Sequence, residues 1–368
     1  MSIEYTVTLT PSGNTFKAAA DETILEAALR QGIGLPYGCR NGACGSCKGT
    51  LVAGDFDYGD YQERSLQASE KAAGKALFCV GRACSDVTLQ IKEIGGAGDI
   101  QIRTLPCRVE KKEIVAPDVA VLSLKLPAQE RLQYLAGQYI DILLKDGQRR
   151  SYSMANAPHH DQYVELHIRH LPEGHFSNFV FNEMRDRAIL RFEGPFGTFF
   201  LREESDKPMI FVAGGTGFAP IKAVLEHAFF KHADREMVLY WGCRSRIDLY
   251  MADIPVQWAK EHPNFTFIAV LSEPKVTDEW HGRTGFVHQA VLDDFESLAG
   301  YQVYACGAPA MVEASQQSFI ARGLPEDEFF ADAFTHAVLA APATAATTAT
   351  PATLTANQTE TTVVASPT

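Results

Sequence analysis

The chain reads Cys39-Arg40-Asn41-Gly42-Ala43-Cys44-Gly45-Ser46-Cys47, a C-x4-C-x2-C spacing, and a fourth cysteine follows at Cys79. This spacing is typical of plant-type [2Fe–2S] sites, in which three thiolates from one tight loop and one from a distant segment surround two irons. Glycines at 38, 42 and 45 suit a loop that turns sharply and directs backbone N–H groups at the cluster sulfurs. The sequence therefore predicts that a [2Fe–2S] cluster is held by Cys39, Cys44, Cys47 and Cys79.

Two other metal sites compete with this interpretation. Zinc modules usually contain paired C-x2-C knuckles or histidines, and the first histidine of this chain is His159. The same lack of histidine excludes a Rieske centre from the segment, because that centre needs two histidine ligands. Cys84 stays open as an alternative fourth ligand in place of Cys79.

Composition narrows the class of protein. The chain has 368 residues, 46% hydrophobic and 21% charged, which is ordinary for a globular protein of two or three domains. The apolar stretch between Lys207 and Lys222 contains glycine and proline and is too short for a membrane span. No export signal opens the chain, so we expect a cytoplasmic protein whose cysteines serve metal or redox chemistry. The net charge of −12 argues against nucleic-acid binding, which needs a basic face.

The cysteine loop belongs to a first expected domain over residues 1–94. Alternating apolar residues from Tyr5 to Leu9 predict a strand, and a turn at 11–14 leads into a second strand. A short helix starting at Ile24 is expected to end at Gly32. The run Gly95-Gly96-Ala97-Gly98 has the composition of a flexible linker, so we place a domain boundary at residues 95–99.

The rest of the chain divides into two segments and a tail. Between 100 and 203, turn residues separate apolar segments and predict an antiparallel sandwich or barrel, with strands at 119–124, 138–143, 164–168 and 189–192. From 208 to 334, helical stretches alternate with apolar strands and predict βαβ units around a parallel sheet, with strands at 209–213, 238–241 and 303–305. Residues 335–368 are rich in Ala, Thr and Pro and cannot bury enough apolar surface to fold, so we expect a disordered tail.

The middle segment contains a candidate flavin motif. The chain reads Arg150-Ser151-Tyr152-Ser153, then His167-Ile168-Arg169, then Gly174-His175-Phe176-Ser177 before a helix expected from Asn178 to Met184. An aromatic ring can stack on an isoalloxazine, an arginine can pair with a phosphate, and a helix N-terminus with a hydroxyl suits a flavin nucleotide. A strand tyrosine beside a surface arginine is the alternative interpretation of the same residues.

A glycine loop in the third segment indicates nucleotide binding. The chain reads Gly214-Gly215-Thr216-Gly217-Phe218-Ala219-Pro220 after an expected strand and before a helix that runs to Lys231. Such glycines let the backbone approach a phosphate. Pro220 replaces the third glycine of the Rossmann fingerprint, and Trp241-Gly242-Cys243-Arg244 stands where the acidic residue of that fingerprint is usual. Cys306-Gly307-Ala308-Pro309 would face the same cleft, although a lone cysteine there is more often a small buried residue.

Together, the motifs of residues 1–334 resemble the ferredoxin–NAD(P)H reductase family with an N-terminal plant-type ferredoxin domain. The resemblance depends on the cysteine loop and on Gly137–Ile142, Arg150–Ser153, Gly194–Gly197, Gly214–Pro220 and Tyr240–Gly242. The family includes CDP-6-deoxy-Δ3,4-glucoseen reductases and reductase components of multicomponent oxygenases such as phenol hydroxylase. It implies a multidomain α+β and α/β fold with a β-grasp ferredoxin domain, an antiparallel β-barrel FAD domain over 100–203 and a parallel-sheet NAD(P) domain over 208–334.

The resemblance also implies roles for individual residues. Arg150 would bind the flavin phosphate, Tyr152 would stack on the ring, and Ser153 would approach its reactive edge. Other FAD contacts are implied for Ser151, His167, Ile168, Arg169, Gly174, His175, Phe176 and Ser177. The NAD site would include Gly214, Gly215, Thr216, Gly217, Phe218, Arg244, Cys306, Gly307 and Pro309, with Cys306 beside the nicotinamide. Many members end in an aromatic residue that shields the flavin, and Phe330 and Phe334 are the candidates here, although a tail follows Phe334.

The implied function is an oxidoreductase that passes electrons from NADH through FAD and the [2Fe–2S] cluster to a partner protein. Both a dehydratase of a dideoxysugar pathway and an oxygenase component fit as that partner. A redox sensor that binds its partner without turnover is an alternative of another class. A free flavin reductase would not need the cysteine set.

Two further expectations concern the electron donor and the acceptor. Arg244 and Arg246 lie where a 2′-phosphate could sit and by themselves favour NADPH, whereas the family resemblance and the nearby Asp248 favour NADH. Beyond the cluster loop lies an acidic group that is either a solvated loop or a docking surface for a basic partner, formed by Asp55, Asp57, Asp60 and Glu63. The linker at 95–99 would let the ferredoxin domain swing between flavin and partner, or pack in one pose.

Overall fold

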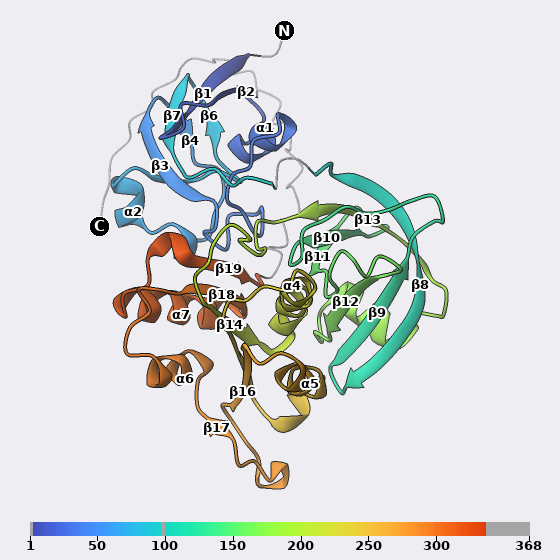
Figure 1. The fold of residues 1–368 in the computed structure, drawn as a ribbon. Helices are drawn as coiled ribbons and strands as arrows, with labels where there is room; N and C mark the ends of the chain where they lie inside the picture. The colour runs from blue at the N-terminus through green and yellow to red at the C-terminus, as the bar shows by residue number, and fades with distance from the viewer. Residues whose placement is uncertain (1–2, 97–99, 336–368) are drawn as a thin grey trace, which may run out of the picture. The chain divides into compact units, whose positions relative to one another are not determined.

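The computed structural model describes residues 3–96 and 100–335, and its first part is a five-stranded sheet of order β2-β1-β7-β3-β5 (Figure 1). β1 (Glu4–Thr10) pairs antiparallel with β2 (Thr15–Ala19) and parallel with β7 (Val87–Gln90). β3 (Lys48–Ala53) pairs antiparallel with β7 and with β5 (Lys75–Leu77). A small second sheet joins β4 (Phe56–Asp57) to β6 (Arg82–Ala83), and the whole has the mixed pairing of the implied β-grasp fold.

Helix α1 (Ile24–Arg30) covers this sheet, and its sequence fixes where it begins. The Thr23 hydroxyl accepts a hydrogen bond from the Glu26 backbone N–H at 3.2 Å, and the Glu26 carboxylate accepts one from the Thr23 N–H at 3.0 Å. This capping box satisfies two N–H groups that the first turn would otherwise leave unpaired. The apolar side of the helix, including Ile24 and Ala28, is buried in the core. Two short elements follow the cysteine loop, η1 (Glu63–Ser65) and α2 (Ala68–Ala72).

The second part is a six-stranded antiparallel sheet of order β11-β10-β13-β8-β9-β12. Its strands are β8 (Arg103–Ala116), β9 (Val119–Lys125), β10 (Tyr139–Leu143), β11 (Arg149–Ser153), β12 (Val164–Arg169) and β13 (Ile189–Phe196). Met154, directly after β11, bridges antiparallel to Leu166 on β12. The two edges of the sheet therefore meet, and the sheet closes into a barrel around one apolar core.

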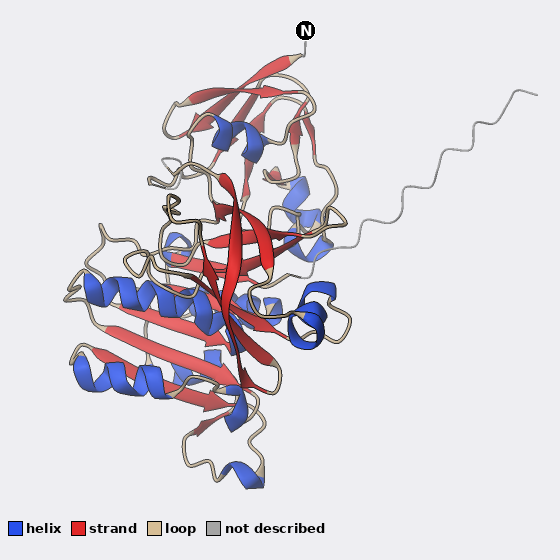
Figure 2. Cartoon of the chain, turned by 90° about the vertical axis from the view of Figure 1, so that its right-hand side faces the viewer, coloured by secondary structure: helices blue, strands red, loops and turns tan. Residues whose placement is uncertain are grey.

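The third part is a six-stranded parallel sheet of order β17-β16-β15-β14-β18-β19. Its strands are β14 (Met209–Gly214), β15 (Met237–Cys243), β16 (Phe265–Leu271), β17 (Arg283–Thr284), β18 (Gln302–Gly307) and β19 (Phe329–Ala333). Helices flank the strands (Figure 2) and are α4 (Phe218–Phe230), α5 (Asp253–Glu261), α6 (Val287–Asp294) and α7 (Pro309–Ala321). The first two pack into one core and the last two into another, which explains why the central strands read as continuous apolar runs.

The remaining short elements lie in loops. They are α3 (His175–Asn178) and the π-helix η2 (Phe179–Glu183) in the barrel part, and the 3-10 turns η3 (Gly215–Gly217), η4 (Arg246–Asp248), η5 (Val276–Asp278) and η6 (Glu326–Glu328) in the third part.

The structure differs from the sequence predictions at one helix, and it contains strands that were not predicted, among them β3, β7, β8, β16 and β19. The helix predicted from Asn178 begins earlier, at His175, because the Ser177 hydroxyl donates to the Gly174 carbonyl at 3.1 Å and tightens that turn. β8 has no predicted counterpart, since its central residues are charged and mostly exposed and hide the alternation. The other predicted strands are present, with bounds that shift by a few residues at most.

Parts of two predictions fall outside the described residues, namely linker positions 97–99 and the tail from 336 onward. Within 3–96 and 100–335, no helix combines the length and the apolar character that crossing a membrane requires.

Candidate functional site

The cysteine loop runs between α1 and β3, and its shape depends on glycines. Gly42 has a φ of 70°, which side chains rarely tolerate. A Cβ on Gly42 would lie 2.8 Å from the Asp60 carbonyl oxygen, and one on Gly38 would lie 3.3 Å from Cys44 Sγ. Larger residues at 38 or 42 would therefore displace the loop or one of its thiols.

The four predicted ligands lie as two pairs of thiols, Cys39 with Cys44 and Cys47 with Cys79. Backbone N–H groups point at them, because the Cys39 N–H donates to Cys44 Sγ and the Ala43 N–H donates to Cys39 Sγ, both at 3.4 Å. The hydrogen bond from Cys44, aided by backbone N–H groups, lowers the pKa of the Cys39 thiol to about 6. Two pairs of cysteine sulfurs are the donor set for two bridged irons, so these residues fit a [2Fe–2S] cluster.

Cys84, the alternative ligand, is exposed, whereas Cys79 is buried beside Cys47. Among the residues that the structure describes, no three His, Cys, Asp or Glu side chains gather so as to hold a single metal ion.

The predicted flavin strand is β11, on the barrel edge beside β10. Tyr152 is half-buried, and its ring packs on the buried Phe176 with centroids 5.5 Å apart. Burial raises the pKa of the Tyr152 hydroxyl, which therefore stays protonated. Arg150 is partly exposed and donates at 2.8 Å to the carbonyl oxygen of Arg149. Phe176 therefore supports the Tyr152 ring. A flavin phosphate would offer Arg150 a charged partner in place of its present neutral ones.

The segments at 167–169 and 174–177 use several of their side chains inside the protein. His167 Nδ1 lies 2.8 Å from the Tyr250 hydroxyl oxygen, and Nε2 lies 3.0 Å from Glu165 Oε1. Ile168 is fully buried in the barrel core, and Ser177 is buried with its hydroxyl bonded to nearby backbone. His175 is exposed at the start of α3. For His167, Ile168 and Ser177, it is the backbone groups that would meet a cofactor.

The glycine loop packs tightly against the end of β18. A Cβ on Gly217 would lie 2.0 Å from the Cys306 carbonyl oxygen, and one on Gly215 would lie 2.7 Å from the Arg169 guanidinium. Trp241 Nε1 donates to the Gly215 carbonyl oxygen at 2.9 Å and holds the loop from below. The loop residues Thr216 and Phe218 are buried, and the Phe218 ring stacks on Trp241. Backbone N–H groups are therefore what this loop presents to a ligand.

Asp332 is a site residue that the sequence-based set lacks. The Ser153 hydroxyl donates to Asp332 Oδ2 at 3.3 Å, and Asp332 lies beside Cys306 in the β18–β19 register. Burial, together with the nearby Cys44 thiol, raises the pKa of this carboxyl group to about 7. A lone carboxylate in the otherwise apolar strand 329–333 was the signal that could have identified it. Ser153, Cys306 and Asp332, from three different strands, converge at one point.

The end of β18 holds the remaining predicted residues. Gly307 has a φ of 151°, and the Phe334 N–H donates to its carbonyl oxygen at 2.9 Å. Pro309 is the first residue of α7, where its missing N–H costs nothing. The Phe330 ring packs on Tyr304 and on the Arg202 guanidinium, so it is already used inside the protein. Phe334 follows the end of β19, beyond Asp332, and is the remaining candidate for the shield.

The residues expected to choose between NADH and NADPH lie around η4. The Arg244 side chain is 65% exposed, and its Nε is 3.9 Å from Asp248 Oδ2. Arg246 donates to the Asp278 carbonyl oxygen at 3.0 Å. Asp248 is buried and accepts hydrogen bonds from the Ser245 N–H and hydroxyl at 3.0 and 3.1 Å. Asp248 therefore shapes the turn, and Arg244 and Arg246 are both exposed.

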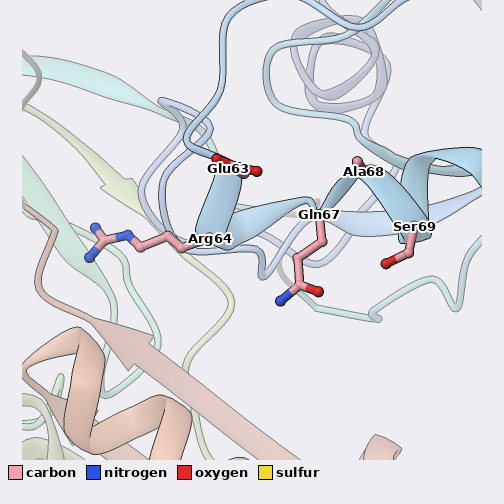
Figure 3. Close-up of a pocket in the computed structure, with 5 residues that line it drawn as sticks. All are labelled: Glu63, Arg64, Gln67, Ala68 and Ser69. Atoms are coloured by element: carbon pink, nitrogen blue, oxygen red, sulfur yellow. The ribbon is translucent and has the colours of Figure 1, made fainter.

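The acidic group beyond the cluster loop, Asp55, Asp57, Asp60 and Glu63, is exposed throughout. Asp57 lies 3.8 Å from Arg82, and Glu63 borders a hollow of about 480 Å³ lined also by Arg64, Gln67, Ala68 and Ser69. The long side chains of Arg64 and Gln67 extend from η1 and the start of α2 (Figure 3). No residue of the three cofactor motifs lines this hollow, so we assign it no cofactor.

Comparison with known protein families accounts for each of the three parts. Residues 7–84 match the 2Fe-2S iron-sulfur cluster binding domain, residues 106–201 the oxidoreductase FAD-binding domain, and residues 211–317 the oxidoreductase NAD-binding domain. These three matches follow one another in the order of the three sheets.

Curated relatives match over nearly their whole length. The CDP-6-deoxy-L-threo-D-glycero-4-hexulose-3-dehydrase reductase of Yersinia pseudotuberculosis is 45% identical, over 89% of this chain and 98% of that protein. Reductase component 1 of terephthalate 1,2-dioxygenase from Comamonas sp. is 35% identical, over 87% and 94%. Among solved structures, the Amycolatopsis cytochrome P450 reductase GcoB is similar with a TM-score of 0.74 and 33% identity, over 90% of this chain and 99% of that chain.

Proposed function

Because the chain belongs to the family of iron–sulfur flavoprotein reductases that join a 2Fe-2S domain to FAD- and NAD-binding domains, we propose that it supplies electrons to a sugar-nucleotide dehydrase. The single observation that carries this choice of acceptor is the 45% identity to the Yersinia dehydrase reductase, against 35% to the Comamonas dioxygenase component. An oxygenase component is the second candidate acceptor, favoured by that latter similarity. The cofactor set and the thiolate ligands suit the cytoplasm, where pyridine nucleotide is supplied and thiols stay reduced.

When bound, the pyridine nucleotide, the flavin and the iron–sulfur cluster would together supply the chemistry that converts a two-electron donor into a source of single electrons. The chain's own residues supply position and charge. We assign Arg150 to a flavin phosphate and Tyr152, braced by Phe176, to the face of the ring. Ser153, linked to Asp332, would meet the reactive edge of the flavin, where a hydroxyl that can donate and a carboxyl that holds a proton near neutral pH are both in reach.

In the NAD-binding part, the backbone of Gly214–Phe218 is assigned to the nucleotide pyrophosphate and Cys306 to the nicotinamide. The Cys306 thiol is fully buried, and burial raises its pKa well above the usual value. A neutral thiol of this kind contributes shape and not charge beside the nicotinamide. Phe334 is assigned to the shielding position, and the cluster ligands to Cys39, Cys44, Cys47 and Cys79.

For the electron donor we propose NADH over NADPH. The exposed Arg244 would accommodate a 2′-phosphate, but the neighbouring Arg246 already donates to the Asp278 carbonyl oxygen. A catalytic efficiency higher with NADPH than with NADH would overturn this choice. In either case, Arg244→Ala should lower the catalytic efficiency with NADPH, because Arg244 is the residue placed to meet the 2′-phosphate. The catalytic efficiency with NADH should stay nearly unaltered.

The acceptor is tested with purified partners. The holoenzyme is mixed with NADH and either a CDP-hexulose dehydrase with its substrate or an aromatic-ring oxygenase with its substrate, and product formation is measured. Product only with the dehydrase supports the proposal, and product only with the oxygenase replaces it by the second candidate. Steady NADH oxidation with ferricyanide serves as the control in both arms, because its absence would favour a redox sensor that does not turn over.

A further inference from the structure

The cluster loop and the flavin barrel meet at one arginine. Arg40 directly follows the ligand Cys39, and its guanidinium forms an ion pair with Asp141 on β10. Its Nε donates to the Tyr139 hydroxyl oxygen at 3.1 Å, and its Cζ lies 3.6 Å from the centre of the Phe196 ring. One side chain of the ferredoxin domain thus engages a carboxylate, a hydroxyl and an aromatic face of the barrel.

The backbone at Arg40 indicates that this side chain is needed. Arg40 has a φ of 58°, in the left-handed region where glycine and asparagine are the usual residues. A non-glycine residue persists there where the surrounding structure over-determines its conformation. Glycine would meet the backbone requirement of the loop, so what arginine adds is the reach to the barrel.

Asp141 depends on Arg40 for its charge balance. The carboxylate is 2% exposed, accepts a hydrogen bond from the Ser151 hydroxyl at 2.7 Å, and lies 3.7 Å from the half-exposed Arg149. A buried carboxylate is unfavourable unless it is paired. Withdrawal of Arg40 would leave Asp141 with one distant and mostly solvated partner, so the barrel itself favours the docked loop.

The contact continues on both sides of Arg40. The Tyr139 hydroxyl donates to the Gly38 carbonyl oxygen at 2.7 Å. At Thr198, the hydroxyl donates to the Tyr37 carbonyl oxygen at 2.9 Å and accepts from the Tyr37 N–H at 3.0 Å. Tyr139 and Phe196 also belong to the same buried apolar cluster as the core of the ferredoxin domain.

The contact between the cluster loop and the barrel lies beside Ser153, the residue assigned to the reactive edge of the flavin. Tyr139, whose hydroxyl donates to the Gly38 carbonyl oxygen, lies opposite Ser153 in the β10–β11 register. The docked loop, in which Gly38 precedes the ligand Cys39, therefore contacts the strand neighbour of the residue assigned to the reactive edge of the flavin. With both cofactors in their assigned sites, this contact would join them without a movement of the domain.

We propose that Arg40 is a positioning residue that, through Asp141, Tyr139 and Phe196, holds the cluster loop on the flavin barrel in one pose for electron transfer within the chain. This proposal rests on the proposed electron-transfer function but on no particular partner. It selects the single pose over the swinging domain that the linker composition allows.

The test compares holoenzyme variants with matched flavin and iron content. Arg40→Met removes the charge and keeps most of the stem, and Arg40→Lys restores a charge. Single-turnover absorbance follows cluster reduction after NADH reduces the flavin, and small-angle scattering follows the radius of gyration. If Arg40→Met leaves the docked pose in about one tenth of the molecules, cluster reduction slows about tenfold, the radius of gyration rises, and NADH-to-ferricyanide activity is retained. Arg40→Lys should recover part of both losses.

The matched control is Arg30→Met, which breaks an arginine–glutamate pair within the ferredoxin domain, away from the barrel. It should change neither cluster reduction nor the radius of gyration. Because Arg40 adjoins a ligand, Asp141→Asn provides a second route that leaves the cluster loop intact, and it should reproduce the slower cluster reduction. Normal cluster reduction and an unchanged radius of gyration in both Arg40→Met and Asp141→Asn would overturn the proposal. Failure of NADH to reduce the flavin in the unaltered protein would instead count against the proposed function.

Discussion

Lys222 is predicted to stabilise the junction between the barrel and the NAD-binding part, and Lys222→Met tests this. Lys222 lies on α4 and is buried, with its Nζ 2.8 Å from Glu226 Oε1 and 3.2 Å from Glu165 Oε1 on β12. It also donates to the Ala155 carbonyl oxygen at 3.0 Å. Methionine has a similar length but no charge, so the variant would leave two carboxylates facing each other in a partly dry site.

The size of the effect follows from Glu165. Burial opposes ionisation of this carboxyl group, but the hydrogen bond from His167 and the charge of Lys222 outweigh it and lower the pKa to about 2. A fall from the ordinary value of 4.5 corresponds to about 3 kcal/mol of stability at neutral pH, shared between His167 and Lys222. Removing one partner of a buried pair generally costs about 3–5 kcal/mol. Because the Glu165 side chain is 27% exposed, we expect a loss of about 2–3 kcal/mol for Lys222→Met, or a Tm lower by about 5–10 °C.

The pH dependence has a definite sign. The folded-state pKa of Glu165 lies below its unfolded value, so its contribution is complete above about pH 4.5 and is lost as the pH falls toward 2. Without Lys222, the pKa of Glu165 rises and most of the contribution is absent at every pH. The Tm difference between the parent protein and Lys222→Met should therefore be largest near pH 7 and shrink below pH 4.5.

The assay is thermal unfolding followed by tryptophan fluorescence at pH 7 and at pH 4, with FAD content matched. Lys231→Met, at the C-terminal end of the same helix, is the control, because Lys231 pairs with Glu203 at 3.2 Å with both side chains about half exposed. Exposed pairs contribute about 0–1 kcal/mol, so this control should move the Tm by no more than about 3 °C. Equal Tm values for Lys222→Met and the parent at pH 7, or a difference that does not depend on pH, would refute the reasoning.

Three further substitutions test the assigned site residues. Cys44→Ser should abolish the visible iron–sulfur absorption and cytochrome c reduction while NADH-to-ferricyanide activity persists. Substitution of the exposed Cys84 by serine should leave the spectrum unchanged. Loss of both activities together in a folded Cys44→Ser protein would contradict separate flavin and cluster steps. Arg150→Ala should weaken FAD retention on gel filtration, because a phosphate would lose a charge-assisted partner, and recovery of FMN in place of FAD would contradict the pyrophosphate assignment. Asp332→Asn should slow flavin reduction by NADH about 10–100-fold with FAD content unchanged, and a normal rate would remove Asp332 from the catalytic group.

Local patterns in the sequence were sufficient for the division into three sheet-containing parts and for a set of candidate cluster ligands. Cysteine spacing is a local property, and three of the four thiols lie within one loop whose glycines fix its turn. The apolar runs of β14, β15 and β18 are continuous because helices cover both faces of the parallel sheet, and this pattern is visible without any knowledge of the partners.

Residues that act through partners distant in sequence were harder to predict from the sequence. His167 was assigned to FAD from the family resemblance, yet its ring is bonded to Tyr250 and Glu165, and Tyr250 lies 83 positions away in the chain. Asp332 was overlooked because its importance arises from Ser153, 179 positions earlier. Both pairings join residues that are far apart in sequence, so the spacing of residues along the chain does not reveal them.

The contact between the ferredoxin domain and the barrel is equally hard to predict from sequence, and it decides between a swinging domain and a fixed pose. A glycine-rich composition at 95–98 measures only how freely the connecting chain can bend. Whether the domain uses that freedom depends on the free energy of its contact, which here includes a buried carboxylate, two hydroxyl-mediated links and a shared apolar cluster. Arg40 and Asp141 are 101 positions apart, so this contact is invisible in the linker and in either domain taken separately. A glycine-rich linker composition and a fixed pose are therefore compatible, and Arg40→Met is the substitution that tests whether the contact maintains that pose.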